Sequence, residues 1–299
     1  MSFTLDIINE LTLREREQTC CKKALLFGLF FAAERISRSE LVAEFKTQES
    51  AELAALILKK QFTAEPTVEA IVRAGRKMYH VTVSSKALSI YIERLDRGEI
   101  TNINELDELI GFRCKECRKA FLAGVFIVCG LATDPKKRYS IEFCSKSEIR
   151  AATLSTFLCA NIGEPRCVDR RSRIGLYYRG NEQIADILAY MGAFSANFAV
   201  VDAFFENELK NNENRATNCA LKNIEKSVAA TRRQIDAIEL LKSSGRFDLM
   251  SEELKYTANL RCENDLATLA ELAALHEPSI SKSGLNRRLE KIVAFAYEV

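Results

Sequence analysis

The chain has 299 residues, of which 47% are hydrophobic and 28% charged, a length that allows two or three modest domains. The formal net charge is only +2, which excludes a uniformly basic surface, so any nucleic-acid-binding surface must be local. The ten cysteines are scattered and do not form the framework of a small secreted domain. The N-terminus lacks a signal-peptide pattern, and the longest apolar run is too short to span a bilayer. We therefore expect a cytoplasmic protein with free thiols.

The first predicted elements are repeated later in the chain. Residues Cys21–Ala33 align with Cys117–Cys129, 96 positions further on, with coinciding Cys, Lys, Ala, Leu, Gly and Phe. Strand-like alternation, a helical stretch, more strand-like sequence and a short helix follow each copy. We therefore predict two αββαββα half-domains at about residues 20–96 and 116–192. Together they form a pseudo-two-fold α+β domain over residues 1–207.

A glycine lies inside the first helix of each half-domain, at Gly28 and Gly124. Because glycine costs about 1 kcal/mol relative to alanine inside a helix, these positions predict two closely packed helices. The stretch 122–130 resembles the signature helix of LAGLIDADG homing endonucleases, in which each of two helices delivers an acidic residue that holds a divalent metal. The matching positions here are Ala33 and Cys129, so we expect a degenerate domain with no catalytic residue.

A cluster of arginines marks the sheet of the second half-domain. Arg173, Tyr177 and Arg179 share one strand face, and Arg170 and Arg171 are expected at the turn that enters the strand. The resemblance implies a sheet that forms a saddle over DNA, where such cations would neutralise phosphates.

Two acidic residues argue against that DNA saddle. Glu44 and Glu142 occupy matching polar positions of the two half-domains and would repel phosphates. A solvated sheet face and a DNA-binding face therefore remain open as alternatives.

Cys114 and Cys117 form a CxxC pair that could belong to a zinc site. Zinc requires four ligands, and the sequence contains no second CxxC pair, while its two histidines, His80 and His276, lie far away. We therefore expect small apolar thiols at the start of a helix, with no metal and no cofactor.

Residues 208–245 are expected to form a linker helix, because Asn211 to Lys242 contains no proline or glycine. Apolar residues from Leu221 to Ile238 keep a three-four spacing, which predicts a packing stripe. Residues 246–299 then show three short helical patterns, at 251–262, 268–275 and 281–296. Ser279 or Ser281 is the expected N-cap of the last helix.

The last helical pattern has the layout of a DNA-recognition helix. Leu285, Leu289 and Ile292 form an apolar stripe that should pack against Leu269 and Leu272. Polar and cationic residues face away from this stripe or flank it, as a helix that reads base edges and phosphates requires. The predicted DNA-binding residues are Ser281, Lys282, Ser283, Asn286, Arg287, Arg288 and Lys291.

Taken together, these segments resemble the WhiA family of bacterial regulators, which joins a degenerate LAGLIDADG domain to a C-terminal helix-turn-helix. The matching segments are 20–24, 121–124 with 134–135, 214–219, 269–272 and 280–289. One departure is Arg287, which stands where the family is expected to carry histidine. The substitution could alter base preference while preserving affinity for DNA.

The resemblance implies a non-enzymatic, nucleoid-associated regulator of transcription, cell division and chromosome segregation, with a role in sporulation in some relatives. The expected partner is double-stranded DNA, with a transcription factor or division protein as a further possible partner, and no membrane or small-molecule substrate is expected. Two alternatives remain open. One is a residual metal-dependent endonuclease that uses Glu34 or Asp134, and the other is an adaptor that binds a protein of the division machinery.

Overall fold

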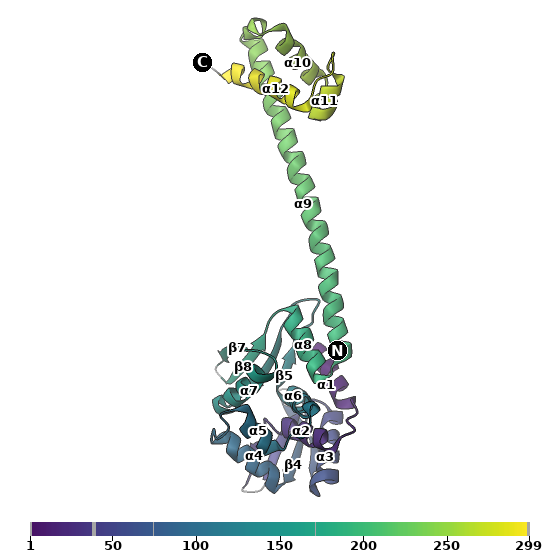
Figure 1. The fold of residues 1–299 in the computed structure, drawn as a ribbon, viewed down its shortest axis with the longest axis vertical. Helices are drawn as coiled ribbons and strands as arrows, with labels where there is room; N and C mark the ends of the chain where they lie inside the picture. Colours follow the sequence, from purple (N-terminus) through teal and green to yellow (C-terminus); the bar gives the residue numbers. More distant parts are fainter. Residues whose placement is uncertain (1, 38–39, 74, 171, 298–299) are drawn as a thin grey trace. The chain divides into compact units, whose positions relative to one another are not determined.

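The computed structural model describes residues 2–37, 40–73, 75–170 and 172–297. The chain divides into two compact units, Met1–Asn207 and Glu208–Val299. Figure 1 shows the elements of each unit in chain order. Among the described residues, no helix combines the length and apolar character that crossing a membrane would demand.

The N-terminal unit contains the same series of elements twice. The first series is α2 (Thr19–Leu29), β1 (Glu34–Arg35), β2 (Glu40–Phe45), α3 (Gln48–Phe62), β3 (Thr67–Arg73), β4 (Arg76–Ser84) and α4 (Lys86–Asp96). The second is α6 (Lys115–Cys129), β5 (Gly130–Ala132), β6 (Ile141–Ser145), α7 (Glu148–Asn161), β7 (Arg166–Arg170), β8 (Arg173–Tyr178) and α8 (Asn181–Met191). Both series read αββαββα, as the repeat predicted.

Each series builds one antiparallel four-stranded sheet. The strand orders are β1-β2-β4-β3 and β5-β6-β8-β7, so the two sheets have the same topology. Alternate residues of β2 (Leu41, Ala43 and Phe45) are buried, which fits the strand-like alternation predicted there. Ile141 and Phe143 are the buried counterparts in β6. The fold therefore confirms the predicted α+β class with a pseudo-two-fold repeat.

Helices α2 and α6 pack against each other with almost no space between their backbones (Figure 1). A Cβ atom on Gly28 would lie 2.2 Å from the Phe121 carbonyl oxygen, and one on Gly124 would lie 2.3 Å from the Leu25 carbonyl oxygen. Any side chain at either position would therefore force the two backbones apart. The close approach predicted from the two glycines is confirmed.

Two further helices complete this unit, and the repeat did not reveal them. Helix α1 (Phe3–Leu13) buries Ile7, Ile8 and Leu11 completely, and the Thr4 hydroxyl donates to the Ala132 carbonyl oxygen at 2.9 Å. Helix α5 (Ile103–Ile110) begins with a capping box, which satisfies backbone N–H groups that its first turn leaves open. Both helices contribute buried side chains to the apolar core of this unit.

Helix α9 (Phe194–Ser243) begins well before the predicted start at Asn211. Gly192 ends α8 in the left-handed conformation, and no glycine or proline follows until Gly245, so nothing interrupts a helix that starts at Phe194. The predicted packing stripe is only partly buried. Leu221, Ile224 and Val228 are exposed, whereas the C-terminal end of the helix packs into the core of the second unit through Ala237, Ile238 and Leu241.

The second unit ends in three helices after a short 3-10 turn (Arg246–Leu249). These helices are α10 (Glu252–Glu263), α11 (Leu269–Leu275) and α12 (Lys282–Tyr297). Leu272 of α11 lies in one core with Leu285 and Leu289 of α12, and Leu269 packs against that core. This packing confirms the predicted helix-turn-helix core.

Candidate nucleic-acid interface

The start of α12 is built by a side-chain cap. The Ser281 hydroxyl accepts from the Gly284 backbone N–H at 3.1 Å, which identifies Ser281, rather than Ser279, as the N-cap. This bond satisfies one of the backbone N–H groups that the first turn of a helix leaves open. Leu285, Leu289 and Ile292 are buried behind it, as the apolar stripe predicted, so the opposite face of α12 must face solvent.

The exposed face of α12 carries several of the predicted DNA-binding residues. Ser281, Lys282, Ser283, Arg287 and Lys291 are exposed, and Asn286 is half-buried. The Asn286 side-chain amide donates to Glu290 at 2.9 Å. Within the described part of the chain, Lys282, Arg287 and Lys291 form no ion pair. These three cations are therefore free to meet an anionic partner.

Arg288 differs from the other cations of α12. Its guanidinium is paired with Glu253 of α10, and its Nη1 lies 3.0 Å from His276 Nε2. His276 is itself buried and also contacts the Thr257 hydroxyl at 3.1 Å. Arg288 thus joins α12 to α10 and to the turn before α12, so its predicted contact with a phosphate would compete with this pairing.

A buried arginine holds the connection between α10 and α11. Arg261 is completely buried, and its Nη2 donates to the carbonyl oxygens of Asp265 at 2.8 Å and Ala267 at 2.9 Å. Thr268 and Glu271 then form a capping box at the start of α11. These bonds fix the segment that precedes the two helices of the motif.

The predicted arginines of the sheet lie around strand β8. Arg173 is exposed at the start of β8, and Arg179 follows its end, where its guanidinium lies over the Tyr177 ring at 4.8 Å from the centroid. Arg170 is the last residue of β7 and pairs with Arg173 across the hairpin. Arg171 lies outside the described residues. Arg173 and Tyr177 lie at alternate positions of β8, and Arg179 contacts Tyr177 just beyond the end of the strand.

The two acidic residues of the sheets are already paired with arginines. Arg73 lies 3.0 Å from Glu44, and Arg170 lies 3.1 Å from Glu142. In each pair the arginine is the last residue of its strand, β3 or β7. The expectation that these glutamates would repel phosphates therefore overstates their effect, because each charge is offset by its neighbour.

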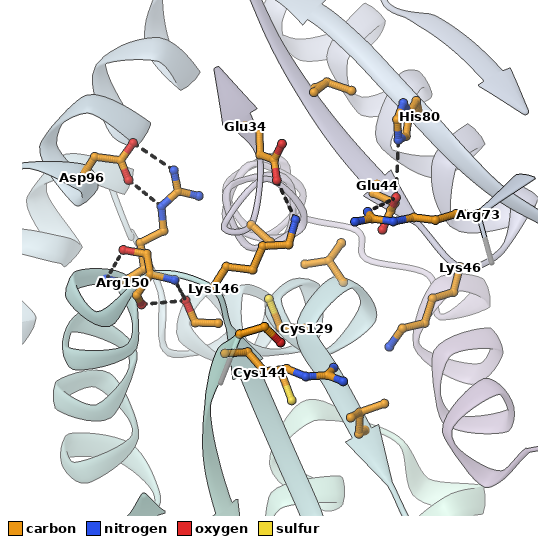
Figure 2. Close-up of a pocket in the computed structure, with 18 residues that line it drawn as sticks. Glu34, Glu44, Lys46, Arg73, His80, Asp96, Cys129, Cys144, Lys146 and Arg150 are labelled. Atoms are coloured by element: carbon orange, nitrogen blue, oxygen red, sulfur yellow. Dashed lines mark hydrogen bonds and ion pairs between the residues drawn. The ribbon is translucent and has the colours of Figure 1, made fainter. Parts of the chain in front are cut away.

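A cavity of about 840 Å³ opens at the C-terminal ends of α2 and α6, the two helices that correspond to the LAGLIDADG signature helices (Figure 2). Among the described residues that line it, five are cationic and three are carboxylates. The cations are Lys46, Arg73, Lys146, Arg150 and Arg173, and the carboxylates are Glu34, Glu44 and Asp96. In a LAGLIDADG nuclease this place would need carboxylates that hold metal, whereas here cations outnumber them.

Two of these cations bond directly to the backbone just beyond the signature helices. Arg150 Nη1 donates to the Ala33 carbonyl oxygen at 2.8 Å and to the Phe31 carbonyl oxygen at 2.9 Å. Lys46 Nζ donates to the Gly130 carbonyl oxygen at 2.6 Å, and burial lowers the pKa of this lysine. Each half-domain thus supplies a cation to the helix end of the other, and both cations would repel a divalent ion.

The remaining donors do not fit a pair of Mg²⁺ ions either. Ala33 is buried and offers no side-chain ligand, and burial raises the pKa of Cys129 to about 12, so Cys129 remains a thiol. Glu34 is paired with Lys146 at 2.7 Å. Asp134, the second carboxylate considered for a nuclease, accepts from the Lys136 backbone N–H and is not among the described residues that line the cavity. We therefore derive no metal-dependent step at this site.

The sequence reasoning missed Lys46 and Arg150. A signal for the first existed, because Lys46 and Lys146 each precede the N-cap of a helix, Thr47 or Ser147, at equivalent places in the repeats. Arg150 had no such signal. Its partners, the Ala33 carbonyl and Asp96, are far away in sequence, and only the packing of the two half-domains brings them together.

Contrary to the expectation from the sequence, Cys114 and Cys117 have two further cysteines beside them. Cys20 and Cys21 lie beside them, although more than ninety residues separate the two pairs in sequence. The adjacent pair Cys20–Cys21 is not a CxxC motif, and it comes close only because α2 and α6 start side by side.

Comparison with known proteins identifies the family. Residues 118–210 match the WhiA LAGLIDADG-like domain, and residues 214–296 match the WhiA C-terminal HTH domain. A relative from Caldicellulosiruptor saccharolyticus, named "Probable cell division protein WhiA", is 31% identical and is aligned over 100% of this chain and 96% of its own. A relative of the same name from Oceanobacillus iheyensis is 30% identical and is aligned over 100% of this chain and 98% of its own.

A solved structure supports the fold. The chain is similar to full-length DUF199/WhiA from Thermatoga maritima, with a TM-score of 0.59 and 21% identity over 99% of this chain and 97% of the other. Both domains match WhiA models, and the relatives are aligned over the whole chain. The chain therefore belongs to the WhiA family.

Proposed function

We propose that this chain is a non-catalytic DNA-binding protein that regulates transcription in cell division and chromosome segregation. The observation that carries the proposal is the exposed face of α12, where Lys282, Arg287 and Lys291 have no ion-pair partner among the described residues. Unpaired cations on the second helix of a helix-turn-helix suit contact with phosphates and guanine edges. Double-stranded DNA is the partner of matching chemistry and size, and the protein would be associated with the nucleoid.

The individual roles follow from the positions on α12. Arg287 lies on the outer face and would contact base edges with Asn286, which must exchange its bond to Glu290 for a base. Lys282 and Lys291 lie near the first and third turns of the helix and would contact phosphates. Ser281 and Ser283, whose hydroxyls are 3.1 Å apart at the N-cap, would donate to the backbone of the DNA.

The sheet face makes a smaller, separate contribution to this proposal. Arg173 and Arg179 are exposed, and Arg170 is shared with Glu142. A second contact to phosphates there would lengthen the bound site without adding base specificity. The assignment to cell division rests on the printed names of the relatives, which are probable cell division proteins.

Genomic occupancy tests the DNA-binding part of the proposal. The full chain and the double variant Arg287→Ala with Lys291→Ala would be mapped by chromatin immunoprecipitation. We expect occupancy of discrete sites near division genes and its loss in the double variant. A matched control is Lys59→Ala with Lys60→Ala, which removes two exposed cations from α3. Unchanged occupancy in the α12 variant would instead indicate an adaptor that reaches DNA through another protein.

Plasmid cleavage tests the non-catalytic part. The pure chain would be incubated with supercoiled plasmid and Mg²⁺ or Mn²⁺. We expect no nicking, because Lys46 and Arg150 bond to the backbone where a nuclease holds metal. Reproducible nicking that Glu34→Ala or Asp134→Ala abolishes would contradict the proposal.

A further inference from the structure

Four cysteines meet where the two signature helices begin. Cys20 and Cys21 lie in the first turn of α2, Cys114 is the N-cap of α6, and Cys117 lies in the first turn of α6. Their four Sγ atoms all lie within 4.8 Å of one another. Within the described residues, this is the one group of three or more potential metal ligands that meets this distance.

The spacing of the sulfur atoms is that of ligands around one metal ion. Cys114 Sγ lies 3.8 Å from Cys20 Sγ and 3.5 Å from the Sγ atoms of Cys21 and Cys117. A tetrahedral ion with bonds of about 2.3 Å to sulfur places its ligands about 3.8 Å apart. A disulfide instead requires a separation of about 2.0 Å. An iron–sulfur cluster encloses several metal and sulfide atoms and would need wider spacing between the cysteines.

We propose that Cys20, Cys21, Cys114 and Cys117 bind one Zn²⁺ ion in a four-thiolate site. Zn²⁺ favours this ligand set because it is a borderline-soft ion without a geometric preference that conflicts with a tetrahedron. All four positions around the ion are filled by protein, so the site is structural and has no open position for chemistry. The ion would join the two half-domains, since each contributes two ligands.

The surroundings of the cluster suit an anionic metal site. One Zn²⁺ with four thiolates carries a net charge of −2, which requires nearby positive charge or N–H donors. Arg16 lies in the segment just before α2 and lines one surface cavity together with Cys21. Its Nη1 is held by the carbonyl oxygens of Leu11 and Arg14, whereas its Nη2 is buried without a hydrogen-bond partner. The positive charge of Arg16 would partly offset the charge of an anionic metal site in this region.

The site lies at the opposite end of the signature helices from the degenerate nuclease cavity. Ala33 and Cys129 follow or end the helices, whereas the cysteines open them. The zinc proposal therefore concerns the assembly of the half-domains and is independent of DNA binding. In a LAGLIDADG nuclease, metal at the helix ends performs the chemistry, whereas here metal at the helix starts would hold the two halves together.

Metal content and Co²⁺ substitution test the proposal on the full chain. The protein would be purified in reducing buffer without chelator, analysed by inductively coupled plasma mass spectrometry, and then reconstituted with Co²⁺. We expect one equivalent of zinc per chain, and the Co²⁺ form should show thiolate-to-metal charge transfer and the intense visible bands of a tetrahedral ion. Substoichiometric zinc together with a Co²⁺ spectrum lacking these bands would overturn the proposal.

Variants assign the metal to these four residues. Cys20→Ser removes a half-buried ligand, and we expect this variant to lose its zinc on dialysis against a chelator that leaves the wild type loaded. The control is Cys159→Ser with Cys219→Ser, which changes two exposed cysteines elsewhere and should retain full zinc. Retention of zinc by Cys20→Ser and by Cys114→Ser would refute the assignment.

Two further results decide the proposal if a cysteine variant fails to fold. A mercurial reagent that blocks thiols should release one zinc per wild-type chain, and an indicator dye would measure it. The second is mass spectrometry of the wild type as first isolated, with free thiols alkylated at lysis and no reductant or chelator added. A disulfide among these four cysteines in that protein would overturn the proposal in favour of a redox pair.

Discussion

The cavity of the N-terminal unit and helix α12 of the C-terminal unit are both rich in cations, but those cations are bonded differently. Arg150 is buried and Lys46 half-buried, and both donate to backbone carbonyl oxygens. Arg287 and Lys291, in contrast, are exposed and have no ion-pair partner in the described part of the chain. A cation that already satisfies buried oxygens supports the fold, and one without a partner is available to a ligand. Local charge alone does not separate these roles.

The largest expected effect on stability comes from replacing a glycine of α6, whereas the same change in α12 should have little effect. Gly124→Ala would place a Cβ 2.3 Å from the Leu25 carbonyl oxygen, so α2 and α6 must separate. We expect a loss of about 4 kcal/mol or failure of this unit to fold. Gly284→Ala in α12 meets only the Ser281 hydroxyl at 3.2 Å and should stay within about 1 kcal/mol of the wild type, because alanine is the better helix former.

Urea unfolding followed by hydrogen exchange, resolved to each helix, would measure both changes. The exchange of α2 and α6 should accelerate in Gly124→Ala, while α12 should stay protected in Gly284→Ala. Equal protection of α2 and α6 in Gly124→Ala and in the wild type would contradict the close approach of these helices.

The next effect concerns the buried cation of the cavity. Arg150→Ala removes a bidentate pair with Asp96, at 2.7 and 3.0 Å, and the donors to two carbonyl oxygens. Because the oxygens of Phe31 and Ala33 would lose a charged partner, we expect a loss of about 3 kcal/mol in the free energy of unfolding.

Lys146→Ala is the matched control for Arg150→Ala. Lys146 and its partner Glu34 are mostly exposed, so this change should cost less than about 1 kcal/mol. Chemical denaturation monitored by circular dichroism would compare the two variants. If both variants lost a similar free energy of unfolding, the burial of Arg150 would not explain its contribution to stability.

The repeat, the glycine contact and the helix-turn-helix could be predicted because each leaves a pattern in short segments of sequence. Gly28 and Gly124 occupy the same position in two repeated helices, and Leu285 and Leu289 follow the spacing of one helix face. The cavity cations and the cysteine cluster depend on contacts between segments far apart in sequence. Arg150 finds the Ala33 carbonyl, and Cys114 finds Cys20, only after α2 and α6 have packed together.

A smaller effect is expected in the titration of Glu34. The hydrogen bond and charge of Lys146 lower the pKa of Glu34. A lowered carboxyl pKa adds stability above the ordinary pKa of the group, and this contribution is lost as the pH falls through the lowered value. We expect Lys146→Ala to raise the Glu34 pKa toward its ordinary value, as measured by carboxyl ¹³C NMR. An unchanged pKa would show that the pair does not persist in solution.

Restoring carboxylates to the signature helices should have no catalytic effect. In the double variant Ala33→Asp with Cys129→Asp, the new carboxylates would pair with Arg150 and Lys46, which already lie at those helix ends. We expect no Mg²⁺ binding by calorimetry and no plasmid nicking. Metal-dependent nicking by this variant would show that the absence of carboxylates at positions 33 and 129 is enough to explain the lack of nuclease activity.

The most direct test of the central claim is a DNA-binding titration at several salt concentrations. Fluorescence anisotropy would follow the full chain on a double-stranded fragment from an occupied site. For the double variant Arg287→Ala with Lys291→Ala, we predict a Kd about 10 to 100 times that of the wild type. Its salt dependence should fall by about one phosphate contact. The control variant, Lys59→Ala with Lys60→Ala, should bind like the wild type. Equal affinity and equal salt dependence in the wild type and the α12 variant would contradict the claim that the free cations of α12 contact DNA.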